Sequence, residues 1–239
     1  MSVAALSPLP ALFLAACAAI AVSGCSVSIG LDDAERRTEI DLVDPDGIVA
    51  LDVETGNGRV EVIGADVDEI EVRSLIVETD EGDAEYSVRR DGDRLVVVGD
   101  CDGGWLDPCS VGFRITAPAD LDVAIDTSNG RIDVDGMTGE LDVETDNGAI
   151  DVGGAGAVTA RAETDNGRVE LAFEGTPELV VASSDNGAIT VRVPDAAAFA
   201  VDADSDHGAV EVDERTDPDA DHRIDATTDN GAITVQYTD

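Results

Sequence analysis

Carboxylates that recur at one position of a repeated phrase are the side chains of this sequence best placed to bind cations. The nine residues ETDNGAIDV at 144–152 belong to a phrase that occurs, with small changes, seven times in the chain. Stacked copies would place equivalent carboxylates about 5 Å apart, where each adjacent pair repels by about 0.8 kcal/mol in a water-like dielectric. Five copies carry an aspartate directly before the corner, which is Asn-Gly in four of them and His-Gly in one, namely Asp146, Asp165, Asp185, Asp206 and Asp229.

Either dissolved salt or bound calcium must relieve this repulsion. Salt is the simpler explanation, because the Debye length falls to about 3 Å at 1 M ionic strength. Bound calcium is the more specific explanation, since its preferred ligands are carboxylate oxygens. The copies lack the glycine-rich nonapeptide of calcium-binding β-rolls, however, so the sequence assigns no cofactor and keeps calcium as the alternative.

No catalytic group stands out among the many carboxylates. With 53 acidic residues, some pair will always have a spacing suited to acid–base chemistry, so such a pair carries no weight. The chain has no Gly-rich phosphate loop, no GxSxG and no HExxH motif, and its only histidines are His207 and His222. We expect a protein that is not an enzyme, with a carbohydrate-active enzyme as the least favoured reading.

The charge of the chain excludes one class of partner and suggests a habitat. Acidic residues outnumber basic ones 53 to 14, the net charge is −39, and every basic residue is arginine. Nucleic-acid binding is excluded, because affinity for phosphate backbones needs clustered basic side chains. Acidity spread along the whole chain is typical of proteins from salt-loving microorganisms, where salt screens the repulsion.

The N-terminus predicts export and a lipid anchor. An apolar run at 11–22 has the length of a signal peptide and is short for a membrane span. It is followed by Val22-Ser23-Gly24-Cys25, which resembles a lipobox, although a basic n-region is missing. We therefore expect a signal peptide at 1–24, lipidation of Cys25, a tether at 25–38, and a location outside the cytoplasm, on the outer face of the membrane.

The remaining cysteines agree with an oxidising exterior. Cys101 and Cys109 lie in CDGGWLDPC, with no CxxC motif and no histidine nearby, so a disulfide is favoured over a metal site. Trp105 lies inside this loop and is read as a lid over one end of the core, or as a contact for a partner.

The repeat also predicts the elements that position these side chains. Around Asn147, Val143 and Thr145 alternate with acidic residues, and Ile150 and Val152 continue the alternation beyond the corner. Both halves of a copy are therefore strands with one buried face, and the corner is expected to use positive-φ backbone. Equivalent corner residues, which would form a ladder, are Asn57, Asn129, Asn147, Asn166, Asn186, His207 and Asn230.

Two all-β architectures fit this unit. A type I′ turn at Asn-Gly would give an antiparallel meander of hairpins. A corner at Asn-Gly would give a β-solenoid, whose rungs of 18–23 residues stack in parallel, in chain order, about 4.8 Å apart. The solenoid is favoured, because the corner hardly varies between copies, as expected when side-chain amides hydrogen-bond along a ladder.

The order of these segments supplies a family resemblance. A first GNGRVEV unit, an irregular β-rich stretch, the strand FRITAPADLDV and a series of Asn-Gly units follow one another. This order resembles the prokaryotic "putative adhesin" family of repeat β-solenoid domains, found on envelope proteins and lipoproteins. The resemblance covers residues 39–239, with irregular strands at 66–118 and regular rungs at 119–239, and it implies a fold and a location without a catalytic residue set.

These observations predict a non-catalytic interaction or structural module, anchored at the cell envelope and resembling an adhesin. Its partners are expected to be the membrane, through the lipid, and an envelope protein or glycan. The alternative is an acidic envelope protein that cations stabilise, whose stacked carboxylates are themselves the working feature.

Overall fold

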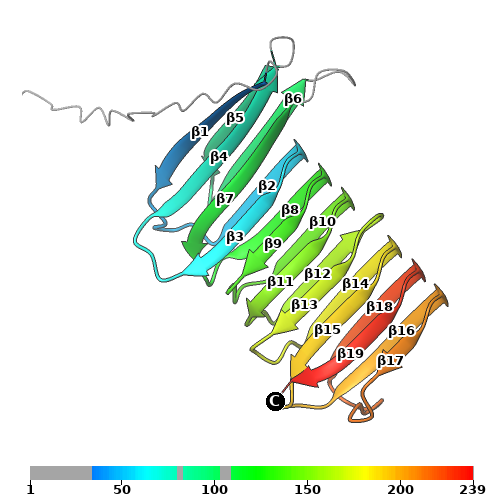
Figure 1. Cartoon of the computed structure of the whole chain (residues 1–239). Helices are drawn as coiled ribbons and strands as arrows, with labels where there is room; N and C mark the ends of the chain where they lie inside the picture. The colour runs from blue at the N-terminus through cyan, green and yellow to red at the C-terminus, as the bar shows by residue number, and fades with distance from the viewer. Residues whose placement is uncertain (1–33, 80–82, 103–108, 239) are drawn as a thin grey trace, which may run out of the picture.

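The computed structural model describes residues 34–79, 83–102 and 109–238, which form two β-sheets lying face to face (Figure 1). All regular structure in these residues is β-strand. In spatial order, sheet A contains β1 (Ala34–Val43), β4 (Ile70–Thr79), β7 (Ser110–Pro118), β3 (Val60–Ala65), β9 (Ile132–Asp135), β11 (Ile150–Ala155), β13 (Val169–Phe173), β15 (Ile189–Pro194), β19 (Ile233–Thr238) and β17 (Val210–Val212). Sheet B contains β16 (Phe199–His207), β18 (His222–Asn230), β14 (Leu179–Asn186), β12 (Thr159–Thr164), β10 (Leu141–Asn147), β8 (Asp122–Asn129), β2 (Ala50–Asn57), β6 (Arg94–Asp102) and β5 (Asp83–Asp91).

Each Asn-Gly copy is one rung of a β-solenoid, as predicted. A rung is a strand of sheet B, a corner, and a strand of sheet A. The strand β10 pairs in parallel with β8 on one side and with β12 on the other, and β11 pairs in parallel with β9 and β13. The antiparallel meander of hairpins is therefore excluded for these units.

The core lies between the two sheets and is almost entirely aliphatic. The alternation along each strand turns one row of side chains inward, so Val143, Ile150 and Val152 of one rung are buried against their counterparts above and below. Burying a side chain of this size contributes about 1.5–3 kcal/mol. Because every rung repeats the pattern, the stack forms one continuous core.

The corner glycines are required for a reason other than the predicted one. The positive-φ glycines among the described residues are Gly47, Gly92, Gly136 and Gly154, and none of them is a corner glycine. A Cβ atom on Gly148 would instead overlap the carbonyl oxygen of Gly130 in the neighbouring rung. The prediction of positive φ at the corner was wrong, because what selects glycine there is the close stacking of backbones.

Two ladders of side-chain hydrogen bonds run along the corners. The Asn147 amide donates to the Oδ1 of Asn129 at 3.1 Å, and the other corner asparagines repeat this bond from rung to rung. In five copies, the hydroxyl two residues before the corner donates to a glycine carbonyl of a neighbouring rung, as Thr145 does to Gly130 at 3.0 Å. Thr55 donates to the carbonyl oxygen of Val111 instead. Both ladders fix the register between rungs.

The rungs do not stack in chain order at the end of the solenoid that we call the tail. The rung of β18 and β19 lies between those of β14/β15 and β16/β17, so Asn230 stacks on Asn186 and His207 is terminal. The prediction that the rungs stack in chain order was therefore wrong at the tail, where β16 and β17 form the edge. In this position Val210 and Val212 are 42% and 36% exposed.

The opposite end, which we call the head, combines one further rung with antiparallel strands. The strands β6 and β7 pair in parallel with β2 and β3, so they form a rung whose corner carries the cysteines instead of Asn-Gly. The hairpin of β5 and β6 closes sheet B, and β4 and β1 close sheet A. The strand β1 begins at Ala34, so the first described strand starts before residue 39.

Candidate functional site

The outer face of sheet B is strongly acidic, and we call it the acidic face. Parallel register aligns one outward position of each strand into a row across the rungs, so Glu54 lies beside Asp126, Asp126 beside Glu144, and Glu144 beside Glu163. Neighbouring strands are about 4.8 Å apart, which brings these carboxylates close together. Further outward acidic residues on the strands of this face are Asp52, Asp122, Asp142, Asp146, Asp185, Asp202, Asp204, Asp206, Asp225 and Asp229.

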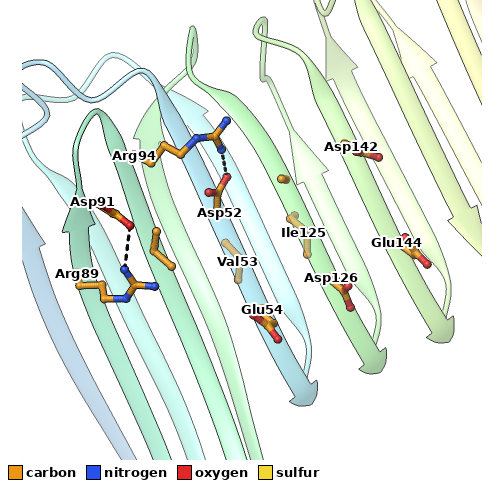
Figure 2. A pocket seen from close by; sticks show the side chains of 12 residues that line it. Asp52, Val53, Glu54, Arg89, Asp91, Arg94, Ile125, Asp126, Asp142 and Glu144 are labelled. Carbon is orange, nitrogen blue, oxygen red and sulfur yellow. Dashed lines mark hydrogen bonds and ion pairs between the residues drawn. The ribbon is translucent and has the colours of Figure 1, made fainter.

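A groove of about 540 Å³ crosses the acidic face at β5, β6, β2, β8 and β10 (Figure 2). The groove forms because Ala124, which lies in the same row as Asp52 and Asp142, has a much smaller side chain than either neighbour. A second hollow of about 340 Å³ shares these three residues and extends the groove to Thr159 and Arg161 on β12. The sheet therefore presents a hollow with carboxylates on its walls.

Carboxylates in the groove differ in whether arginine neutralises them. Arg94 contacts Asp52 at 2.5 Å, and both side chains are drawn paired in Figure 2. Within the described residues, no ion pair reaches Glu54, Asp126 or Glu144. These three side chains point outward from β2, β8 and β10, so they are free to accept hydrogen bonds from a partner (Figure 2).

Glu144 shows the electrostatic consequence of this crowding. Desolvation by its neighbours, followed by the charges of Glu163 and Asp126, raises the pKa of Glu144 above its ordinary value of 4.5. A carboxyl group whose pKa is raised by folding binds its proton more tightly in the folded state than in the unfolded state. Its ionised form therefore destabilises the fold above that pKa, and the effect disappears as the pH falls below 4.5.

We expect Glu144→Gln to stabilise the protein at neutral pH in dilute salt by about 0.5 kcal/mol, the scale of one unfavourable cross-strand pair. The gain should shrink at about 1 M salt, where screening is nearly complete, and below the ordinary pKa of glutamate. Urea unfolding at two salt concentrations and two pH values measures it. Glu174→Gln, at an exposed site outside the strands, is the matched control, and an equal gain in that variant would contradict the explanation.

The five predicted aspartates form a column beside the Asn ladder. Asp146, Asp165 and Asp185 lie on successive rungs, with Asp229 and then Asp206 following because of the changed rung order. All five side chains are exposed. The described part of the chain contains no group of three or more His, Cys, Asp or Glu side chains that could hold a metal ion.

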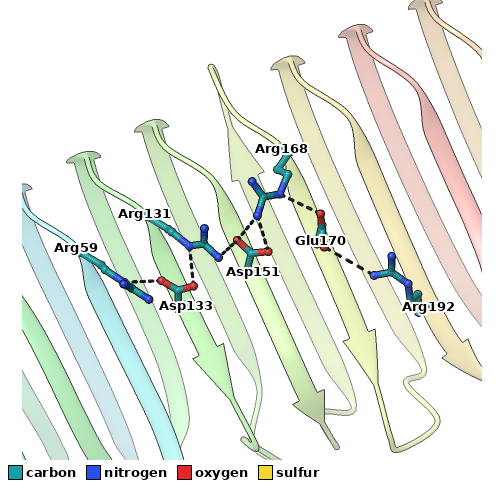
Figure 3. A network of polar contacts seen from close by, with 7 residues as sticks. All are labelled: Arg59, Arg131, Asp133, Asp151, Arg168, Glu170 and Arg192. Carbon is teal, nitrogen blue, oxygen red and sulfur yellow. Dashed lines mark hydrogen bonds and ion pairs between the residues drawn. The ribbon is translucent and has the colours of Figure 1, made fainter.

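Sheet A has a different outer face, where arginines and acidic residues alternate in one connected network (Figure 3). Arg131 bridges Asp133 and Asp151, each at 2.7 Å, and Arg168 bridges Asp151 at 3.2 Å and Glu170 at 2.9 Å. The network continues to Arg59 at one end and Arg192 at the other. The network therefore joins the three arginines that follow Asn-Gly corners, Arg59, Arg131 and Arg168, and it extends across five rungs.

Of the remaining predicted residues, some lie in the described part of the chain and others lie outside it. Cys101 and Cys109 form the predicted disulfide, with their Cα atoms 5.9 Å apart. His222 packs against Phe199, and its Nδ1 lies 2.8 Å from the carbonyl oxygen of Pro177, so it belongs to the tail of the core. The signal peptide, Cys25 and Trp105 lie outside the described residues.

Sequence reasoning missed the groove and the row of Glu54, Asp126 and Glu144. A signal for the row was present, because each of these residues stands three positions before a corner asparagine. The groove had a weaker signal, which is the alanine at position 124, where five of the six other copies have a charged side chain. Among the described residues, no helix is long and apolar enough to span a membrane.

Comparison with known proteins places the fold. A putative cell adhesion protein from Clostridium sporogenes has a solved structure that matches with a TM-score of 0.51 and 14% identity, covering 85% of this chain and 100% of that one. A putative adhesin from Bacteroides fragilis matches with a TM-score of 0.46 and 15% identity, covering 85% of this chain and 97% of that one. No curated protein matches the chain. The family model Toastrack DUF4097 matches residues 34–236, and the chain therefore belongs to this family.

Proposed function

We propose that this chain is a non-catalytic interaction module of the cell envelope, anchored through a lipid on Cys25, which binds a partner through the acidic face. The groove at Ala124, with unpaired carboxylates on its walls, is the observation that carries the proposal. The rungs that form it share one continuous core, so the carboxylates are held on a rigid support. Rigid support lowers the entropy cost of binding.

The chemistry of the groove indicates what the partner presents. Carboxylates accept hydrogen bonds from arginine and lysine side chains, and such charge-assisted bonds are about twice as strong as neutral ones. They also accept hydrogen bonds from the hydroxyl groups of a glycan. The partner is therefore an envelope protein or glycan with cationic or hydroxyl groups, and its contacts repeat from rung to rung. The name of the Clostridium protein, a putative cell adhesion protein, agrees with this role.

Photo-cross-linking in living cells, in their native salt, tests the binding surface. A photoreactive amino acid replaces Ala124 in the groove or, as the matched control, Thr190 on the outer face of sheet A. We expect one reproducible adduct from position 124 and none from 190, with loss of the adduct when Asp126→Asn and Glu144→Gln are combined. Equal labelling from both positions, or only unlinked protein, would overturn the proposal.

The anchor has a separate test. Cys25→Ser removes the thiol that the lipid would modify, so we expect the chain to leave the membrane fraction and to lose incorporation of a labelled lipid precursor. Retention of both in the variant would show that Cys25 is not the anchor. Because the acidic face is unchanged, binding to the partner should survive in the released protein.

A second candidate is an acidic envelope protein whose stability depends on bound cations. The in-register aspartate column favours it, because its repulsion rises as salt is removed. On this view, calcium raises the melting temperature far more than sodium does at equal ionic strength. Equal effects of the two cations would leave screening as the whole explanation.

A further inference from the structure

One region of the outer face of sheet A, at the head, combines exposed aliphatic side chains with arginines. Ile40, Leu42 and Leu75 are 38%, 58% and 43% exposed there, on β1 and β4. Scattered exposed aliphatic side chains need no explanation, but a contiguous group does. We call this group, together with Arg36, Arg73 and Arg114, the head patch.

Strand register shows that the head patch is contiguous. Ile40 lies opposite Arg73 in the antiparallel pairing of β1 and β4, and Leu75 lies opposite Thr38, two positions along β1. Arg73 in turn lies opposite Arg114 on β7. Directly opposed side chains have Cβ atoms about 4.5–5.5 Å apart, and diagonal ones about 7–8 Å. The aliphatic and basic side chains therefore share one surface.

The charge of this surface has the opposite sign to that of the molecule. The outward charged side chains of the described part of β1, β4 and β7 are Arg36, Arg73, Arg114 and Glu71. Glu71 pairs with Arg73 at 2.9 Å, and Arg114 pairs with Glu61 of the next strand at 3.5 Å. The head patch of this chain, whose net charge is −39, is therefore weakly basic and apolar, and it lies on the face opposite the acidic face.

The head is also the end that a lipid on Cys25 would hold near the bilayer. The strand β1 begins at Ala34, so residues 26–33 connect it to Cys25. Nine Cα–Cα steps separate Cys25 from Ala34, and they span at most about 32 Å when fully extended. This step rests on the proposed anchoring at Cys25, and given that anchoring, the first residue of β1 cannot move farther than this from Cys25.

We propose that the head patch docks onto the lipid headgroups and so orients the solenoid, with the acidic face turned away from the membrane. Leu42, Ile40 and Leu75 enter the headgroup region, and the arginines bind lipid phosphates, for which the planar guanidinium is well suited. A single lipid chain gives only marginal binding, and a second, weaker contact makes anchoring stable. The orientation displays the groove to partners outside the cell.

Tryptophan quenching tests the docking with the full, lipidated protein in vesicles of equal parts phosphatidylglycerol and brominated phosphatidylcholine. Leu42→Trp is made with Trp105→Phe, so that one tryptophan reports. Val181→Trp, an aliphatic position on the acidic face, is the matched control in the same background. We expect the Leu42→Trp emission to fall by roughly half, because interfacial side chains lie about 5–10 Å into the headgroup boundary, and the control to stay unchanged.

The outcomes separate docking from anchoring. Flotation of the vesicles is read first, and protein that does not float refutes the anchor and the docking with it. Protein that floats with no quenching at Leu42→Trp, or with equal quenching in the control, overturns the docking and leaves the anchor intact. Arg36→Glu with Arg114→Glu should reduce the quenching while flotation persists. A blue shift of Leu42→Trp emission that depends on protein concentration without lipid would instead indicate a second copy on the patch and would also overturn the proposal.

Discussion

Gly148→Ala is expected to destabilise the solenoid by about 3 kcal/mol or more, at the upper end of the range for overpacking. The added methyl group would overlap the backbone carbonyl of Gly130, and no side-chain rotamer can move that oxygen away. Relief requires the two rungs to separate, which also weakens the hydrogen bonds from Thr145 and Asn147 to the neighbouring rung. Urea unfolding at constant salt measures the loss.

Gly56→Ala is the matched control for this prediction. Gly56 lies two residues before a corner glycine, on the same kind of strand, but a Cβ atom there would have no neighbour within 4 Å. A glycine-to-alanine change at an unstrained position changes stability by less than about 1 kcal/mol, usually for the better. Equal destabilisation by the two variants would show that backbone stacking at the corner is not what requires glycine.

The stacking of the rungs could be predicted from the sequence, because every copy contains the residue pattern that determines it. Alternation around Asn147 fixes which side chains turn inward, and equal spacing between a buried hydroxyl and the Asn-Gly corner fixes the register between copies. The reason for the corner glycine could not be read in the same way. Positive φ and close backbone approach both select glycine, and only the position of the adjacent rung distinguishes them.

The order of the last two rungs was not predicted from the sequence, although their corners differ by His207 in one and Asn230 in the other. The structure indicates why one order is favoured. The rung that lies inside contributes Ile224, Ile233 and Val235, all nearly fully buried, whereas the terminal rung exposes Val210 and Val212. Stacking in chain order would expose the larger aliphatic side chains and bury the smaller ones, which reduces the apolar area removed from water.

The candidate site was predictable only in its charge. The net charge predicted an acidic surface, but not that arginines would form a network on the outer face of sheet A while Glu54, Asp126 and Glu144 on the acidic face lack an ion pair. That separation depends on which face each strand position reaches. Arg131 and Arg168 follow corners and reach sheet A, whereas Glu54, Asp126 and Glu144 precede corners and reach the acidic face.

Removal of the disulfide is expected to lower the free energy of unfolding by about 2–3 kcal/mol, from the entropy of closing a loop with a sequence separation of 8. The rung formed by β6 and β7 has no Asn-Gly pair at its corner, so the disulfide stabilises this corner in its place. Cys101→Ser with Cys109→Ser, compared with the native chain by urea unfolding, measures the loss. A reductant should reproduce the loss in the native chain and leave the variant unchanged, whereas equal stability of variant and native chain would contradict this role.

Removal of the disulfide is also expected to affect the binding surface. The strand β6 contributes Arg94 and Val96 to the groove, and Arg94 holds Asp52 by an ion pair across the strand boundary. If the corner loosens, β6 frays from β2 first, since it is followed only by the hairpin strand β5. Hydrogen exchange should therefore accelerate in β5 and β6 of the double-serine variant and stay slow in β10 and β12. The photo-cross-link at Ala124 should weaken with it, whereas exchange rising equally in all four strands would mean that the disulfide stabilises the solenoid as a whole.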